Sequence, residues 1–363
     1  MISLHAQVGQ LLIMGFDGAE PTPGLRQMLT MLQPGGVILF ARNILDARQT
    51  WELMRACREI VETPMFLCVD MEGGTVDRLK NAIAPAPSVE AVAATQNKKM
   101  FRAHGRLIGE EVRALGFNTD FAPVLDLSFA ASRSVLTSRT VSDDPKQAVI
   151  YAREFLKGLT EARVLGCGKH FPGLGEGNLD SHEMLPVISK SWKRLWAEDL
   201  YPYRALRRQM PFVMVAHAAY PEVTKTGIPA SLSPKWMTDI LRRKIGYTGL
   251  VISDDLEMGG VQAAAAIDQA AVETLRAGAD VFLVCHNEGH VWRTYEAVVR
   301  AAESDPKFAR QVATAARRVL AFKKRMKNVL KTGAAPPSPQ TVRKLRDRML
   351  KFTDRVQKAG AVL

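Results

Sequence analysis

The sequence predicts an α/β fold: a single (β/α)8 barrel of the TIM type, followed by a basic helical extension at the C-terminus. Eight short apolar runs recur along the chain, and helix-like stretches separate them. Near-continuous apolar runs are typical of parallel strands buried on both faces, and strands that alternate with helices indicate βα units. Eight such units favour a closed barrel. An open, doubly wound sheet is the alternative, but no GxGxxG motif follows the first run.

The eight expected strands mostly end in polar or glycine-rich residues, where the loops of a barrel begin. They are residues 11–18, 35–42, 65–74, 117–127, 164–173, 211–220, 249–258 and 280–287. Helical patterns between them, such as 46–62 and 144–162, open with an aspartate, a residue that often caps a helix N-terminus. A last helical pattern, 305–331, is expected to close the barrel.

The C-terminal segment differs in composition from the barrel. We expect the catalytic domain to span 1–332, the segment "GAAPPSPQ" at 333–340 to be a linker, and 341–363 to form a basic amphipathic helix. Five apolar residues of this helix fall on one stripe, at spacings of three and four. They are Val342, Leu345, Met349, Phe352 and Val356. The stripe favours a helix docked against the barrel, and a contact with nucleic acid or an anionic membrane is the alternative.

The net charge of +12 is concentrated in the same part of the chain. Residues 321–363 carry twelve Lys and Arg against two Asp, which leaves +2 for the rest, so nucleic acid is not an expected partner. The sequence has no run of about 18 apolar residues, which a membrane-spanning helix would need, and the N-terminus lacks the pattern of a secretory signal. The four cysteines form no CxxC pair. We therefore expect a cytoplasmic monomer.

Polar residues at the ends of the runs are candidates for one site, because active sites of such barrels lie at the C-terminal ends of the strands. They are Asp70, Glu72, Arg78, Arg139, Lys169, His170, Asp180, Ser181, His182, His217, Asp254 and Asp255. Taken singly, each has a structural explanation: a strand-end aspartate can cap the next helix, and a histidine can be part of the core. Their gathering at one rim favours a catalytic site.

Two other chemistries are less consistent with the spacing of these residues. His170, Asp180, His182 and His217 are possible metal ligands, but no HxH, HExxH or two-cysteine motif is present. The sequence also lacks a GxSxG motif, the pattern that would indicate a serine nucleophile. A strand-end carboxylate and an Asp–His pair, flanked by Arg and Lys, suit acid/base chemistry on a hydroxyl-rich substrate. We therefore expect no metal and no cofactor.

Four separated segments resemble motifs of the family 3 glycoside hydrolases, in the same order. They are "DMEGGTVDR", "KHFPGLGEGNLDSH", "IPASLSP" and "LVISDDLEMGGV". The resemblance spans about residues 8–330 and is strongest to the bacterial β-N-acetylglucosaminidase (β-hexosaminidase) branch. It implies retaining exo-hydrolysis of terminal, non-reducing β-linked N-acetylglucosamine. For members of this kind it also implies recycling of peptidoglycan fragments in the cytoplasm, with a muropeptide or another N-acetylglucosamine oligosaccharide as substrate.

The resemblance also implies roles for individual residues. Asp254 would be the nucleophile and Asp255 its structural neighbour. His182 would be the general acid/base and Asp180 would polarise it, a departure from the carboxylate pair that most glycosidases use. A histidine suits both proton donation and removal, because its unperturbed pKa lies close to neutral pH.

Five further residues would bind the hydroxyl and acetamido groups of the sugar, again by resemblance. They are Asp70, Arg78, Arg139, Lys169 and His170. Many relatives have a third histidine where this chain has Leu174, and the segment "SRTVSDDP" around Arg139 follows the family pattern only loosely. Two alternative functions remain open at this point: a phosphorylase of the same family, which would pass the sugar to phosphate, and a non-catalytic sugar-binding protein.

Overall fold

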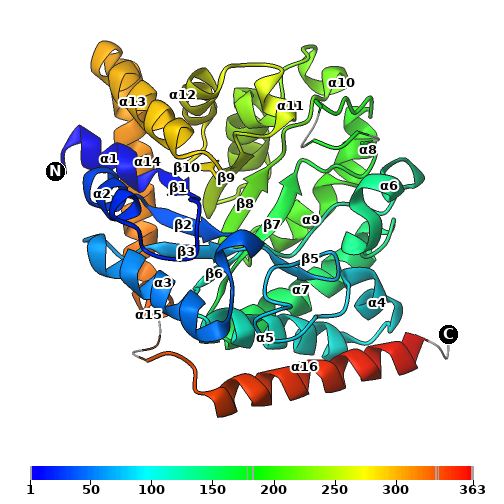
Figure 1. Cartoon of the computed structure of the whole chain (residues 1–363). Coiled ribbons are helices and arrows are strands. Elements are labelled where there is room, and N and C mark those ends of the chain that lie inside the picture. The colour runs from blue at the N-terminus through cyan, green and yellow to red at the C-terminus, as the bar shows by residue number, and fades with distance from the viewer. Residues whose placement is uncertain (1, 178, 182–183, 332, 334, 361–363) are drawn as a thin grey trace.

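The structure, a computed structural model, contains the predicted barrel and describes residues 2–177, 179–181, 184–331, 333 and 335–360 (Figure 1). Eight parallel strands close in a ring, in which the last strand pairs with the first. They are β1 (Leu12–Met14), β2 (Gly36–Leu39), β3 (Phe66–Val69), β6 (Thr119–Asp120), β7 (Leu165–Phe171), β8 (Phe212–Val215), β9 (Leu250–Asp255) and β10 (Val281–Val284). Each strand lies within one predicted run. The barrel prediction is therefore confirmed, and the open-sheet alternative is wrong.

A layer of helices surrounds the strands and buries their outer faces (Figure 1). Its main members are α1 (Leu4–Gln10), α2 (Pro23–Leu32), α3 (Ala47–Ile60), α5 (Lys98–Ala114), α7 (Pro145–Glu161), α9 (Leu200–Leu206), the π-helical η5 (Lys235–Lys244), α12 (Ile267–Ala277), α13 (Glu288–Ser304) and α14 (Pro306–Arg325). Asp46 caps α3 by accepting the backbone N–H groups of Arg48 and Gln49 at 2.8 and 2.9 Å. Asp144 caps α7 by accepting the backbone N–H of Lys146 at 2.8 Å. Both predicted helix starts are confirmed.

Two predicted elements are each divided in the structure. The helix expected over 305–331 is interrupted at Met326, so that α14 is followed by the short α15 (Lys327–Leu330). The run 65–74 continues beyond β3 into a hairpin of β4 (Met71–Gly73) and β5 (Val76–Asp77). Gly73 and Gly74 have φ angles of 90° and 63°, which other residues rarely adopt, and they make the turn of this hairpin. The hairpin places Glu72 and Arg78 beside the C-terminal end of the barrel.

The predicted C-terminal helix is present as α16 (Pro339–Gly360), which begins two residues before the expected start. It lies along the outside of the barrel against α5 and α4 (Val89–Ala94) (Figure 1). Four of the five stripe residues are buried: Leu345, Met349, Phe352 and Val356. The Phe352 ring stacks on His104, with ring centroids 5.8 Å apart. The docked-helix interpretation is therefore confirmed, while the division into domain, linker and tail stays a prediction.

None of the helices in the described ranges is both long enough and apolar enough to cross a membrane.

Candidate active site

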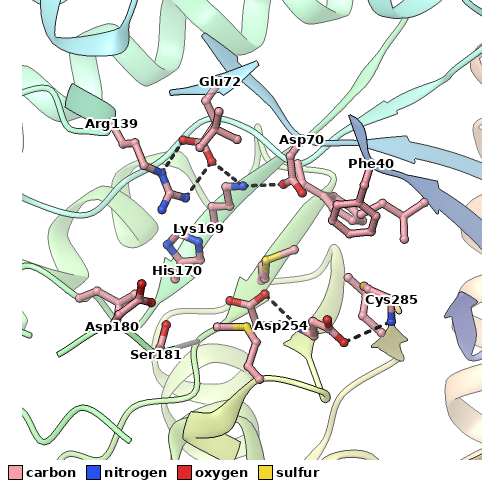
Figure 2. Close-up of a pocket in the computed structure, with 18 of the residues that line it drawn as sticks. Phe40, Asp70, Glu72, Arg139, Lys169, His170, Asp180, Ser181, Asp254 and Cys285 are labelled. Carbon is pink, nitrogen blue, oxygen red and sulfur yellow. Dashed lines mark hydrogen bonds and ion pairs between the residues drawn. The ribbon is translucent and has the colours of Figure 1, made fainter. Parts of the chain in front are cut away.

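One pocket of about 330 Å³ opens at the C-terminal ends of the strands (Figure 2). Asp70 follows β3, Lys169 and His170 lie near the end of β7, and Asp254 lies near the end of β9. Each of these side chains reaches the pocket because parallel strands present their carboxyl ends at the same rim. Residues that are far apart in the sequence therefore share one cavity.

A compact network of charges forms one wall of the pocket. Lys169 Nζ lies 2.7 Å from Asp70 Oδ1 and 2.7 Å from Glu72 Oε1. Arg139 binds the same Glu72 with two hydrogen bonds of 2.8 and 2.9 Å, and Figure 2 shows Glu72 between the two cations. Glu72 is buried, as is Lys169. This arrangement holds both cations at the pocket wall in fixed orientations.

The pKa values of Glu72 and Lys169 agree with ionisation of both groups. Burial alone would raise the pKa of Glu72, but Arg139 and Lys169 together hold it well below its usual range. Burial alone would lower the pKa of Lys169, but Asp70 and Glu72 raise it above its usual value. Each charge is therefore stabilised by a neighbour of opposite sign.

His170 is bound by a residue that our sequence analysis did not select. Its Nδ1 lies 2.6 Å from Oδ2 of Asp126, which is buried and is not among the residues that line the pocket. Asp126 also accepts the backbone N–H of Leu174 at 2.8 Å. The predicted run 117–127 contains Asp126 near its end, so its strand-end position was the signal that could have identified it.

The two neighbouring aspartates of β9 differ in environment. Asp254 is partly exposed and lines the pocket, and its Oδ1 accepts the backbone N–H of Asp255 at 2.9 Å. Burial raises its pKa, but the nearby His170 and His217 outweigh this effect and lower the pKa below its usual value. Asp254 is therefore an ionised carboxylate that faces the cavity.

Asp255 is buried and its side chain accepts the backbone N–H groups of Glu257 and Cys285 at 3.1 and 3.2 Å. Burial raises its pKa to about 8, so it is largely protonated at neutral pH. His217 supports the same segment, because its Nε2 donates to the Asp255 carbonyl oxygen at 2.8 Å and its Nδ1 contacts Ser231 Oγ at 2.6 Å. His217 is fully buried.

The loop after β7 contributes Asp180 and Ser181 to the pocket lining. The Ser181 carbonyl oxygen accepts the backbone N–H of Gly260 at 3.0 Å, which joins this loop to the segment that follows Asp254. His182, the predicted acid/base, lies outside the described residues. Figure 2 shows Asp180 and Ser181 on the side of the pocket opposite Asp70 and Phe40.

Arg78 lines the pocket beside Phe40, with its guanidinium carbon 5.8 Å from the centre of the phenyl ring. Its Nε is buried and has no hydrogen-bond partner among the described residues. Among all the residues that the structure describes, no group of three or more His, Cys, Asp and Glu side chains is arranged to hold a metal ion.

Comparison with known proteins identifies the family. The family model described as "Glycosyl hydrolase family 3 N terminal domain" matches residues 3–322. The chain belongs to glycoside hydrolase family 3. It is therefore a glycoside hydrolase, and the resemblance noted in the four motifs is confirmed.

Several known proteins match most of the chain. A β-hexosaminidase of Pseudomonas aeruginosa is 36% identical over 296 residues, which cover 81% of this chain and 88% of the relative. A β-hexosaminidase of Bordetella pertussis is 38% identical over 259 residues, which cover 69% and 73%. The solved structure of a glycoside hydrolase family 3 β-N-acetylglucosaminidase from Paenibacillus sp. str. FPU-7 superposes with a TM-score of 0.90 and 30% identity. That match covers 97% of this chain and 69% of the other.

In this family 3 chain, the pocket brings together all the described residues to which the resemblance assigns a catalytic or binding role, while His182 lies outside the described residues. They are Asp70, Arg78, Arg139, Lys169, His170, Asp180 and Asp254. Arg139 lies in the pocket wall, bonded to Glu72. The catalytic and binding roles of all these residues stay predictions.

Proposed function

We propose that this enzyme is a retaining exo-β-N-acetylglucosaminidase that removes terminal, non-reducing N-acetylglucosamine from peptidoglycan fragments in the cytoplasm. The observation that carries the proposal is an ionised Asp254 and a wall of paired charges, formed by Asp70, Glu72, Arg139 and Lys169, in one small pocket. Two relatives named β-hexosaminidase and a family 3 β-N-acetylglucosaminidase structure support the choice of sugar. A pocket of about 330 Å³ suits one terminal sugar rather than an extended chain.

Asp254 would act as the nucleophile. Its carboxylate attacks the anomeric carbon, the bond to the leaving oxygen breaks, and a covalent glycosyl-aspartate forms. A lowered pKa keeps Asp254 ionised for this step, whereas the adjacent Asp255 is largely protonated and bonded to backbone N–H groups. Water then attacks the same carbon from the opposite face, and the two inversions retain the β configuration.

His182 would donate a proton to the leaving oxygen and later remove one from the attacking water. Asp180 would orient the imidazole and stabilise its protonated form. The support for this assignment is the family resemblance together with the position of Asp180 and Ser181 in the pocket lining. Asp70, Lys169 and His170, with Arg78 and Arg139, would bind the hydroxyl and acetamido groups of the sugar.

The test is turnover of N-acetylglucosaminyl-β-1,4-anhydro-N-acetylmuramic acid beside chitobiose, with the products identified by NMR spectroscopy. We expect free β-N-acetylglucosamine as the first product, with faster turnover of the muramic acid substrate. Formation of N-acetylglucosamine 1-phosphate in phosphate buffer would show a phosphorylase instead. Sugar binding without turnover of either substrate would show a non-catalytic binding protein.

A further inference from the structure

We propose that Asp126 is a positioning residue of this active site, one that fixes both the ring of His170 and the start of the loop that carries Asp180. The inference rests on the proposed function, because it assigns His170 a contact with the sugar. Asp126 itself is not expected to touch the sugar, because it is buried and is absent from the pocket lining.

The contacts of Asp126 converge on two elements of the site. Its side chain is completely buried, yet both carboxylate oxygens have donors. Oδ2 lies 2.6 Å from Nδ1 of His170, and Oδ1 accepts the backbone N–H of Leu174 at 2.8 Å. The backbone N–H of His170 lies 3.3 Å from each oxygen. A buried carboxylate that accepts from these groups restrains the chain from residue 170 to residue 174.

The contact with Nδ1 selects one tautomer of the imidazole. A carboxylate oxygen accepts a hydrogen bond, so Nδ1 of His170 carries a proton. In the neutral ring Nε2 is then the acceptor, and it is the nitrogen left for a sugar hydroxyl in the pocket that His170 lines. Without Asp126 the proton could move to Nε2, and the ring could rotate about its Cβ–Cγ bond. The hydrogen-bonding character of the pocket wall would then change.

The contact with Leu174 acts on the loop. Gly173 is held in the same region, because its carbonyl oxygen accepts the Tyr220 hydroxyl at 2.7 Å. Two successive residues at the start of the loop are therefore fixed to buried side chains, six residues before Asp180 enters the pocket lining. A shift of the loop at this point would move Asp180 relative to Asp254. Asp126 thus acts on the sugar-binding wall and the acid/base loop together.

The test is Asp126→Asn, which keeps the shape and the Oδ1 acceptor for Leu174 but places an amide in contact with His170. We expect kcat/KM to fall by about 10–100-fold, by analogy with the loss of a partner that orients a metal-bound histidine. The fall should be similar for the disaccharide and for an activated aryl glycoside, because the sugar contact is common to both. A matched control is Asp280→Asn. Asp280 is equally buried, but it binds Arg242 and Arg318 near the opposite end of β9. The kcat/KM of the Asp280→Asn variant should therefore not change.

Two further measurements separate positioning from a general structural role. In a His170→Asn background, Asp126→Asn should lower kcat/KM less than threefold if Asp126 acts mainly through His170. The ¹⁵N spectrum of labelled histidine should show the Nδ1–H tautomer for His170 in the unsubstituted enzyme and its loss in Asp126→Asn. This spectrum needs no substrate, so it tests Asp126 even if the proposed function fails. An Nε2–H tautomer in the unsubstituted enzyme, or the full loss of kcat/KM in the His170→Asn background, would overturn the proposal.

Discussion

Two buried glutamates lie in opposite electrostatic surroundings, and the same substitution should change stability in opposite directions at the two positions. Glu72 bonds to Lys169 and Arg139 and is ionised. Glu111 on α5 is equally buried, but neither of its carboxyl oxygens has a hydrogen-bond partner within the described ranges. Burial, followed by the negative charge of Asp77, raises the pKa of Glu111 well above its usual value. The folded enzyme therefore favours the protonated form of Glu111.

Glu72→Gln removes the charge that two cations share. Lys169 keeps only Asp70 at 2.7 Å, and Arg139 loses both of its short hydrogen bonds to a carboxylate. Leaving a buried charge without its partner costs about 3–5 kcal/mol, and we expect this loss in the free energy of unfolding at pH 7. The charged wall of the pocket, which we propose binds the sugar, loses its fixed geometry at the same time, so kcat/KM should fall as well.

Glu111→Gln should instead raise stability at neutral pH. The unfolded chain releases this proton above a pKa of about 4.3, while the folded enzyme keeps it. The carboxyl therefore makes folding less favourable as pH rises, by up to about 1.4 kcal/mol per pH unit. From pH 4.3 to 7 the loss is at most about 3.7 kcal/mol. Glutamine cannot ionise, so the variant should gain up to this amount at pH 7 and almost nothing at pH 4.

Urea denaturation of the three proteins at pH 4 and pH 7, with kcat/KM measured in parallel, checks both expectations. Glu111 is outside the pocket lining, so Glu111→Gln should retain full activity. Equal destabilisation by both substitutions at pH 7 would refute the reasoning, because it would show that volume and hydrogen bonding, rather than charge, decide the effect. A gain at Glu111 that does not depend on pH would refute the assigned protonation state.

Three further predictions follow from the site and from α16. Asp254→Asn should abolish turnover while the variant still folds and binds N-acetylglucosamine, and a fluorinated glycosyl inhibitor should label Asp254; label on Asp255 would contradict the assignment. His182→Ala should lower turnover of a disaccharide by about 10²–10⁴-fold, and added azide should restore turnover of a dinitrophenyl glycoside. Asp180→Ala should give a weaker form of this pattern. Equal losses on both substrates without azide rescue would show that His182 has a structural role. Phe352→Ala should lower the free energy of unfolding by about 4 kcal/mol, or Tm by about 5 °C for a chain of this length. The control Leu350→Ala removes a side chain that is 47% exposed and should change stability little. A fall in the kcat of Phe352→Ala would show that α16 supports the pocket.

The sequence alone determined the architecture and most of the candidate site. Parallel strands buried on both faces require continuous apolar runs, so each run in the sequence marked a strand of the barrel. The barrel topology then required their polar ends to meet at one rim, and Asp70, Lys169, His170 and Asp254 do so. The family motifs added expected roles. Capping aspartates and the stripe of α16 were equally visible, because they are local patterns with known spacing.

Only the tertiary structure decided which of the ionisable groups carry charge and which residues hold the pocket residues in place. Asp254 and Asp255 are adjacent and chemically identical, yet burial raises the pKa of Asp255 in spite of its backbone donors, while nearby histidines lower that of Asp254. The pairing of Asp126 with His170 joins residues 44 positions apart. No local pattern encodes such a contact or the burial that accompanies it. Both depend on the folded arrangement of the whole barrel, since electrostatic energy depends on distance and burial rather than on sequence order.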